Sequence, residues 1–108
     1  MSPEKQTGAP VFRVIDAMNA PHMGQILRVR LSGGKTPSVR EVKGARLEAR
    51  SPEGVATSVQ VVAFSTIGGK QSDARFGRTG RLDLVVEQDP GEPPVGLRWT
   101  LTGPIKSK

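Results

Sequence analysis

The chain has 108 residues, a length typical of one domain, and its 16 basic and 10 acidic side chains give it a formal charge of +6. It has no cysteine and 1 histidine, which excludes thiol catalysis, disulfide frameworks and the usual zinc sites. No run approaches the roughly 18–20 apolar residues that span a bilayer. Residues 1–7 lack the apolar segment of a signal peptide. We therefore expect a soluble, cytoplasmic domain without a membrane partner.

The first two strands are predicted within residues 11–31. Residues 11–15 form a short mixed run, and residues 25–31 alternate apolar side chains with arginines. The alternating residues are Leu27, Arg28, Val29, Arg30 and Leu31. A period of two is typical of a strand with one buried face. Between the two runs, residues 16–23 are the one place that suits a helical turn, which Pro21 limits.

Further strands are predicted in residues 45–50, 59–64, 81–87 and 95–102. Three of these runs alternate, but the second is apolar at nearly every position, which predicts a strand covered on both faces. No stretch shows helical periodicity. Turn-forming residues separate the runs at positions 19–24, 33–37, 51–54, 67–72, 77–80 and 89–94.

This pattern predicts an all-β fold, a small six-stranded antiparallel barrel, because closing the sheet removes exposed strand edges. We expect a single domain over residues 11–102. Residues 1–10 and 103–108 are polar and interrupted by Pro and Gly, so we expect flexible termini there.

Two motifs resemble parts of functional sites without completing one. Gly34-Lys35-Thr36 has the ending of a phosphate-binding P-loop, but the first glycine and the following helix of that motif are missing. His22 has no serine or orienting carboxylate at a motif spacing, so we expect a turn residue rather than a general base. We therefore expect no enzymatic activity, no cofactor and no metal site.

Basic side chains are concentrated in two segments. Residues 25–50 carry a local charge of +5 and residues 70–81 a charge of +3, whereas residues 82–94 carry −4. Four arginines occupy outward positions on two alternating strands. They are Arg28, Arg30, Arg46 and Arg50. If those two strands are neighbours, these arginines form a broad cationic surface able to displace counterions from a nucleic-acid backbone.

A second basic group is predicted in the loop of residues 75–81, where three arginines and two glycines accompany Phe76. Guanidinium groups suit phosphate, and an exposed Phe76 would stack on a base. Two plainer interpretations stay open: Phe76 belongs to the core, and the positive charge serves solubility. The candidate nucleic-acid-binding residues are Arg28, Arg30, Arg46, Arg50, Arg75, Phe76, Arg78 and Arg81.

Several short motifs also follow one another in a familiar order. A strand carrying Asp16 leads to one that begins at Gly24, a Val42-Lys43-Gly44 turn precedes the next, and Gly80 precedes a late apolar strand. In this order, over residues 11–102, they resemble the second, β-barrel domain of translational GTPases such as elongation factor Tu. Arg81 departs from the pattern, in which Asp usually follows the glycine. The resemblance implies a barrel that docks on tRNA ends, the ribosome or neighbouring protein domains, without nucleotide hydrolysis.

We therefore predict a non-catalytic binding module that contacts RNA or a ribonucleoprotein through a basic barrel face. The alternative is a protein–protein interaction or assembly domain with no nucleic-acid partner, which the apolar run of residues 59–64 favours. The oligomeric state stays open at this point.

Overall fold

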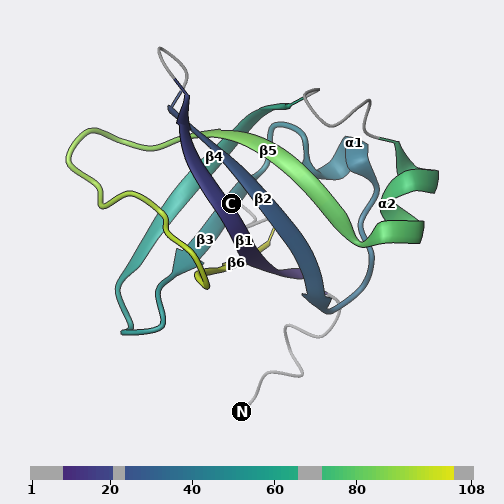
Figure 1. Cartoon of the computed structure of the whole chain (residues 1–108), viewed down its shortest axis with the longest axis horizontal. Coiled ribbons are helices and arrows are strands. Elements are labelled where there is room, and N and C mark those ends of the chain that lie inside the picture. Colours follow the sequence, from purple (N-terminus) through teal and green to yellow (C-terminus); the bar gives the residue numbers. More distant parts are fainter. Residues whose placement is uncertain (1–8, 21–23, 66–71, 104–108) are drawn as a thin grey trace.

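The computed structural model describes residues 9–20, 24–65 and 72–103, which form a closed antiparallel barrel of six strands and two short helices (Figure 1). The elements are β1 (Val11–Ala20), β2 (Gly24–Gly33), α1 (Val39–Val42), β3 (Arg46–Arg50), β4 (Ala56–Phe64), α2 (Asp73–Thr79), β5 (Arg81–Glu87) and β6 (Thr100–Thr102). Around the barrel the strands follow the order β1-β2-β5-β4-β3-β6, and β6 pairs with β1 to close the ring. The predicted six-stranded antiparallel barrel is confirmed.

The interior of the barrel is filled by residues that alternate inward along the strands. Leu27 and Val29 of β2 are fully buried, and so is Leu47 of β3. Burying a side chain of this size is worth roughly 1.5–3 kcal/mol. A slip of one residue in β2 would bring Arg28 and Arg30 into the core instead, so burial of the apolar residues sets the register and keeps both arginines outside.

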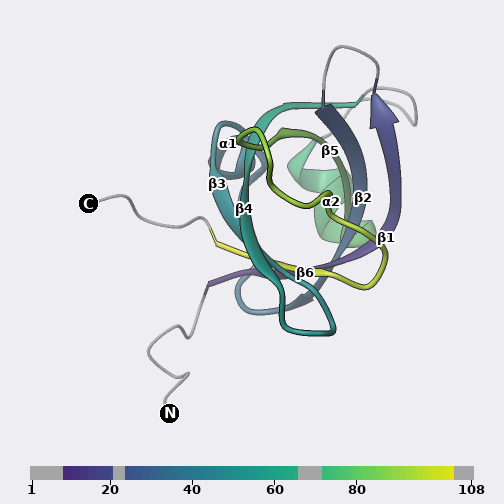
Figure 2. The same ribbon diagram turned by 90° about the vertical axis from the view of Figure 1, so that its left-hand side faces the viewer.

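The two ends of the barrel are covered by different parts of the chain (Figures 1 and 2). Helix α2 lies across one end, and the connection from β5 to β6 lies across the other. At the second end Val95 is buried, and its backbone exchanges two hydrogen bonds with the side-chain amide of Gln25: Val95 N donates to Oε1 at 3.1 Å, and Nε2 donates to Val95 O at 2.9 Å. The covered ends leave the outer faces of the strands as the main accessible surface.

No stretch of the sequence shows helical periodicity, but the structure contains two short helices, α1 of 4 residues and α2 of 7 residues. Helices of about one or two turns are too short to show a 3.6-residue period, and capping groups mark them instead. The Ser72 hydroxyl accepts a hydrogen bond from Arg75 N at 3.2 Å at the start of α2, and Gly80 ends the helix with a φ of 70°. Ser38 and Glu41 form a capping box at α1.

Two strand boundaries also differ from the prediction. Residues 16–20, where a helical turn was expected, belong to β1, which pairs with β2 as far as Ala20 opposite Gly24. The predicted final strand over residues 95–102 is reduced to β6, because Arg98 has a φ of 70° and interrupts the extended backbone. Val14 N still donates to Trp99 O at 2.9 Å, so the chain returns to β1 before β6 begins.

The prediction that residues 59–64 form a strand covered on both faces is wrong, because this run contains a β-bulge. The register of β4 against β5 shifts between Val61 and Ala63, and the extra residue, Val62, is 38% exposed. The strand that is buried on both faces is β5, whose residues 82–86 are all buried. The expectations for residues 1–8 and 104–108, for His22 and for Lys70 lie outside the described residues.

Candidate anion-binding surface

Three arginines stand in register across three neighbouring strands on the outside of the barrel. Arg13 of β1 is opposite Arg30 of β2, and Arg30 is opposite Arg81 of β5. All three are exposed, and adjacent strands lie about 4.8 Å apart, so the row spans about 10 Å. Within the described part of the chain, no carboxylate pairs with any of them. Like charges directly opposite one another destabilise a sheet, so this arginine row costs the free protein stability.

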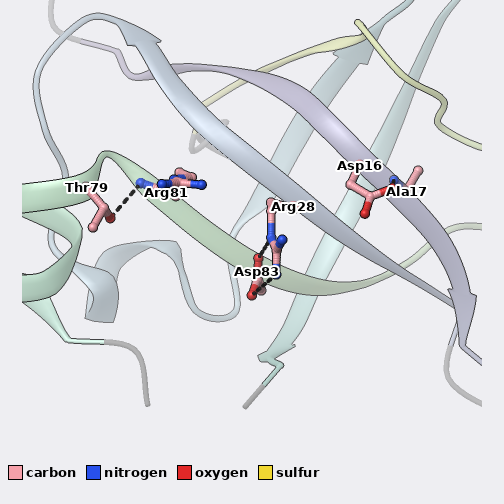
Figure 3. A network of polar contacts seen from close by, with 6 residues as sticks. All are labelled: Asp16, Ala17, Arg28, Thr79, Arg81 and Asp83. Carbon is pink, nitrogen blue, oxygen red and sulfur yellow. Dashed lines mark hydrogen bonds and ion pairs between the residues drawn. The ribbon is translucent and has the colours of Figure 1, made fainter. Parts of the chain in front are cut away.

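The next outward row, by contrast, is neutralised. Arg28 lies opposite Asp16 of β1 and Asp83 of β5, and it pairs with Asp83 (Figure 3). Arg28 Nε donates to Asp83 Oδ1 at 2.9 Å, and Nη2 donates to Oδ2 at 3.4 Å. These hydrogen bonds and the negative charge of Asp83 raise the pKa of Arg28. Asp83 is buried, so Arg28 pairs with a carboxylate that water reaches poorly.

The arginine row ends at a hollow between β5 and α2. The hollow has a volume of about 230 Å³ and is lined by Arg28, Arg75, Thr79, Arg81, Leu82 and Asp83. The Thr79 hydroxyl donates to Arg75 O at 2.9 Å and accepts from Arg81 N at 3.1 Å, which joins the end of α2 to the start of β5 (Figure 3). Tertiary structure thus brings together three of the predicted arginines from three different elements.

Phe76 does not lie on this surface, which corrects its assignment as a stacking ring. It is 2% exposed, and its ring centroid lies 6.2 Å from that of Phe12 in a stacked arrangement. The physical reason is the helix: residues 73–79 turn Phe76 inward, while its neighbours Arg75 and Arg78 are half-buried and exposed. The interpretation of Phe76 as a core residue is therefore confirmed.

Arg46 and Arg50 are also separate from the arginine row, because β2 and β3 are not neighbours. In the ring, β5 and β4 lie between β2 and β3 on one side, and β1 and β6 lie between them on the other. Strands β2 and β3 are therefore on opposite sides of the barrel. Arg50 Nη2 pairs with Glu48 Oε2 at 2.9 Å. Arg46 Nη1 donates to Ser58 Oγ at 2.9 Å. The predicted four-arginine surface on β2 and β3 is thus wrong.

Sequence reasoning missed Arg13, although a signal for it was present. Arg13 stands between Phe12 and Val14, which are both buried, so the alternation of β1 already places it outward. Together with Arg30 it lines a second, larger depression of about 410 Å³ beside the row. Arg78 is exposed on α2 but does not line the hollow.

Other kinds of site are not evident in the described part of the chain. Residues 9–20, 24–65 and 72–103 contain no group of three or more His, Asp or Glu side chains placed to hold a metal ion. No helix in these ranges is long and apolar enough to cross a membrane. Comparisons of the chain with protein-family models, curated proteins and solved structures find no match.

Proposed function

We propose that this protein is a non-catalytic, cytoplasmic binding module that contacts RNA or a ribonucleoprotein through the arginine row. The observation that carries the proposal is the register of Arg13, Arg30 and Arg81 on three neighbouring strands. Such a row is unfavourable in the free protein and becomes favourable when phosphates lie over it. Arginine suits this task because its planar fork forms two hydrogen bonds with one phosphate.

The residues around the row favour contact with the nucleic-acid backbone rather than with bases. Phe12 and Phe76 are buried, and Phe64 and Trp99 pack against the core. No exposed aromatic side chain is therefore available for stacking in the described residues. Backbone contact predicts binding that depends strongly on salt and weakly on base sequence.

The resemblance to the second domain of translational GTPases supports the same proposal. A closed six-stranded barrel agrees with the fold that this resemblance implies. Barrels of one fold serve many functions, however, so the arginine row carries more weight than the fold does. We propose on this basis that the chain is a member of that family with a role in translation.

The test compares two double variants that lose the same formal charge on opposite sides of the barrel. Arg13→Gln with Arg30→Gln removes two cations from the row, and Arg46→Gln with Arg50→Gln is the matched control. Binding of a single-stranded RNA is measured by filter retention between about 50 and 200 mM salt. For three phosphate contacts the slope of log K against log salt is about −2, so wild-type affinity falls about 20-fold over this range.

The row variant should bind more weakly at low salt and show a slope of about −0.7, because one contact remains. The control should retain the wild-type slope and affinity. Equal losses in the two double variants would mean that total charge, rather than the row, governs binding. Absence of RNA binding at low salt would refute the proposed function.

A second candidate function, protein–protein interaction or assembly, is favoured by a different outward row. Met18, Ile26, Val85 and Ala63 lie in register across β1, β2, β5 and β4. Val85 is buried and Ile26 and Ala63 are half-buried, but Met18 is 42% exposed and Val62 of the neighbouring bulge is 38% exposed. Exposed apolar side chains that gather on one face of a domain mark contact surfaces. Two measurements on wild type and Met18→Asp test this candidate: sedimentation for self-association and a pull-down for other partners. The candidate predicts that wild type associates and that Met18→Asp abolishes the association. A wild-type protein that stays a monomer at all concentrations and captures no partner sensitive to Met18→Asp would count against it.

A further inference from the structure

The hollow at the end of the arginine row has the form of a small anion site. Arg75 and Thr79 of α2 line one side, while Arg28, Leu82 and Asp83 line it from β2 and β5. Its volume of about 230 Å³ lies below the roughly 300 Å³ at which pockets for drug-sized ligands begin. A phosphate group with part of its sugar fits such a space, whereas a large organic ligand does not.

The charges around the hollow match a doubly charged anion. Among the described residues that line the hollow, Arg28, Arg75 and Arg81 are positively charged and Asp83 is negatively charged, a formal sum of +2. Arg28 is held by its two contacts with Asp83, so its guanidinium is oriented before a ligand arrives. A phosphate inside a nucleic-acid strand carries one negative charge, but a phosphate monoester carries about −1.5 to −2 at pH 7. The hollow therefore suits a terminal phosphate better than an internal one.

The hollow and the row share Arg81, which connects them. From Arg81 the row continues over Arg30 to Arg13 on successive strands, away from α2. A strand whose end occupies the hollow would therefore lay its following phosphates over Arg30 and Arg13. On the other side, the α2 residues Arg75 and Thr79 line the hollow, so the arginines carried by the strands end there.

We propose that this hollow binds the terminal phosphate monoester of an RNA strand, so that the protein recognises strand ends as well as the backbone. The inference rests on the proposed function and adds to it the chemical group that is recognised. The hollow recognises the phosphate group and not the base or the direction of the strand, so a phosphate at the 5′ end and one at the 3′ end are both tested.

The experiment uses three RNA oligonucleotides of one sequence that carry a 5′-phosphate, a 3′-phosphate or hydroxyl groups at both ends. Fluorescence anisotropy gives the affinity of the full chain for each. We expect at least one phosphorylated oligonucleotide to bind about tenfold more tightly than the unphosphorylated one, the ratio for one charge-assisted contact. The wild-type ratio shows whether the protein recognises a terminal phosphate, and variants then test whether the hollow is the site.

Three substitutions then locate the effect. Arg75→Gln should reduce the ratio to about one, because Arg75 lines the hollow. Arg78→Gln on the same helix is the matched control and should leave the ratio unchanged. Arg13→Gln should weaken binding of all three oligonucleotides by one common factor, because Arg13 belongs to the row and does not line the hollow.

Three results would overturn the inference, and they are distinguishable. If wild type binds all three oligonucleotides with equal affinity, the terminal-phosphate site is refuted while the proposed function stands. If wild type binds none of them at low salt, the proposed function fails, and the inference fails with it. A ratio that Arg78→Gln abolishes and Arg75→Gln preserves would likewise refute the hollow as the site.

Discussion

The ion pair between Arg28 and Asp83 is unequally buried, so we expect the two ways of breaking it to have different costs. The side chain of Asp83 is 12% exposed and that of Arg28 is 41% exposed. Arg28→Gln leaves a poorly hydrated carboxylate without its two hydrogen bonds, which costs about 1–3 kcal/mol. Asp83→Asn leaves a guanidinium that water already reaches, so the cost should resemble that of an exposed pair, about 0–1 kcal/mol.

The coupling between the two side chains should be modest. At an effective dielectric constant near 20, two unit charges about 4 Å apart attract one another by about 4 kcal/mol. The exposure of Arg28 lets solvent screen most of this attraction, so we expect a coupling of about 1 kcal/mol. A double-mutant cycle with Arg28→Gln, Asp83→Asn and the double variant measures it.

The assay is urea unfolding followed by far-ultraviolet circular dichroism, with thermal unfolding as a second measurement. For a domain of about this size, 1 kcal/mol shifts Tm by roughly 4 °C. Because Asp83 raises the pKa of Arg28, the stabilisation that depends on this arginine is present below its unfolded pKa and is lost only as pH rises through the higher folded value. Arg28→Gln should therefore cost the same amount at roughly pH 7 and pH 9. The reasoning is refuted if Asp83→Asn costs more than Arg28→Gln, or if the coupling is zero.

Two further predictions test the core and a close backbone approach. Phe76→Ala should lower the free energy of unfolding, measured in urea, by about 3–5 kcal/mol. Phe76→Leu should lower it less and should leave RNA affinity unchanged. A loss of RNA affinity in the leucine variant would mean that Phe76 belongs to the binding surface. Gly24 has a φ of 85°, and an added Cβ would lie 2.2 Å from Val86 O, so Gly24→Ala should lower Tm severely. Gly44 has a φ of 81° and open space around it, so Gly44→Ala should cost only about 1–2 kcal/mol. Equal effects at the two glycines would contradict the close approach of β2 to β5.

The sequence by itself determined the class of fold and which arginines face outward. Alternation in residues 25–31 and 45–50 placed Arg30 and Arg46 on the outside of their strands, and the structure agrees. Side-chain direction along a strand is a local property with a period of two, so a single sequence carries it. Local patterning could not find α2, however, because seven residues are fewer than two full turns of periodic signal.

Only the tertiary structure decided which outward arginines meet. Arg30 lies beside Arg13 and Arg81 rather than beside Arg46, because β2 pairs with β1 and β5 while β3 lies across the barrel. Pairing of strands distant in sequence depends on how the whole core packs, and alternation within each strand is the same for every strand order. The net charge of +6 follows from the sequence, whereas the arginine row and the adjoining hollow exist only because the closed barrel places β1, β2 and β5 side by side.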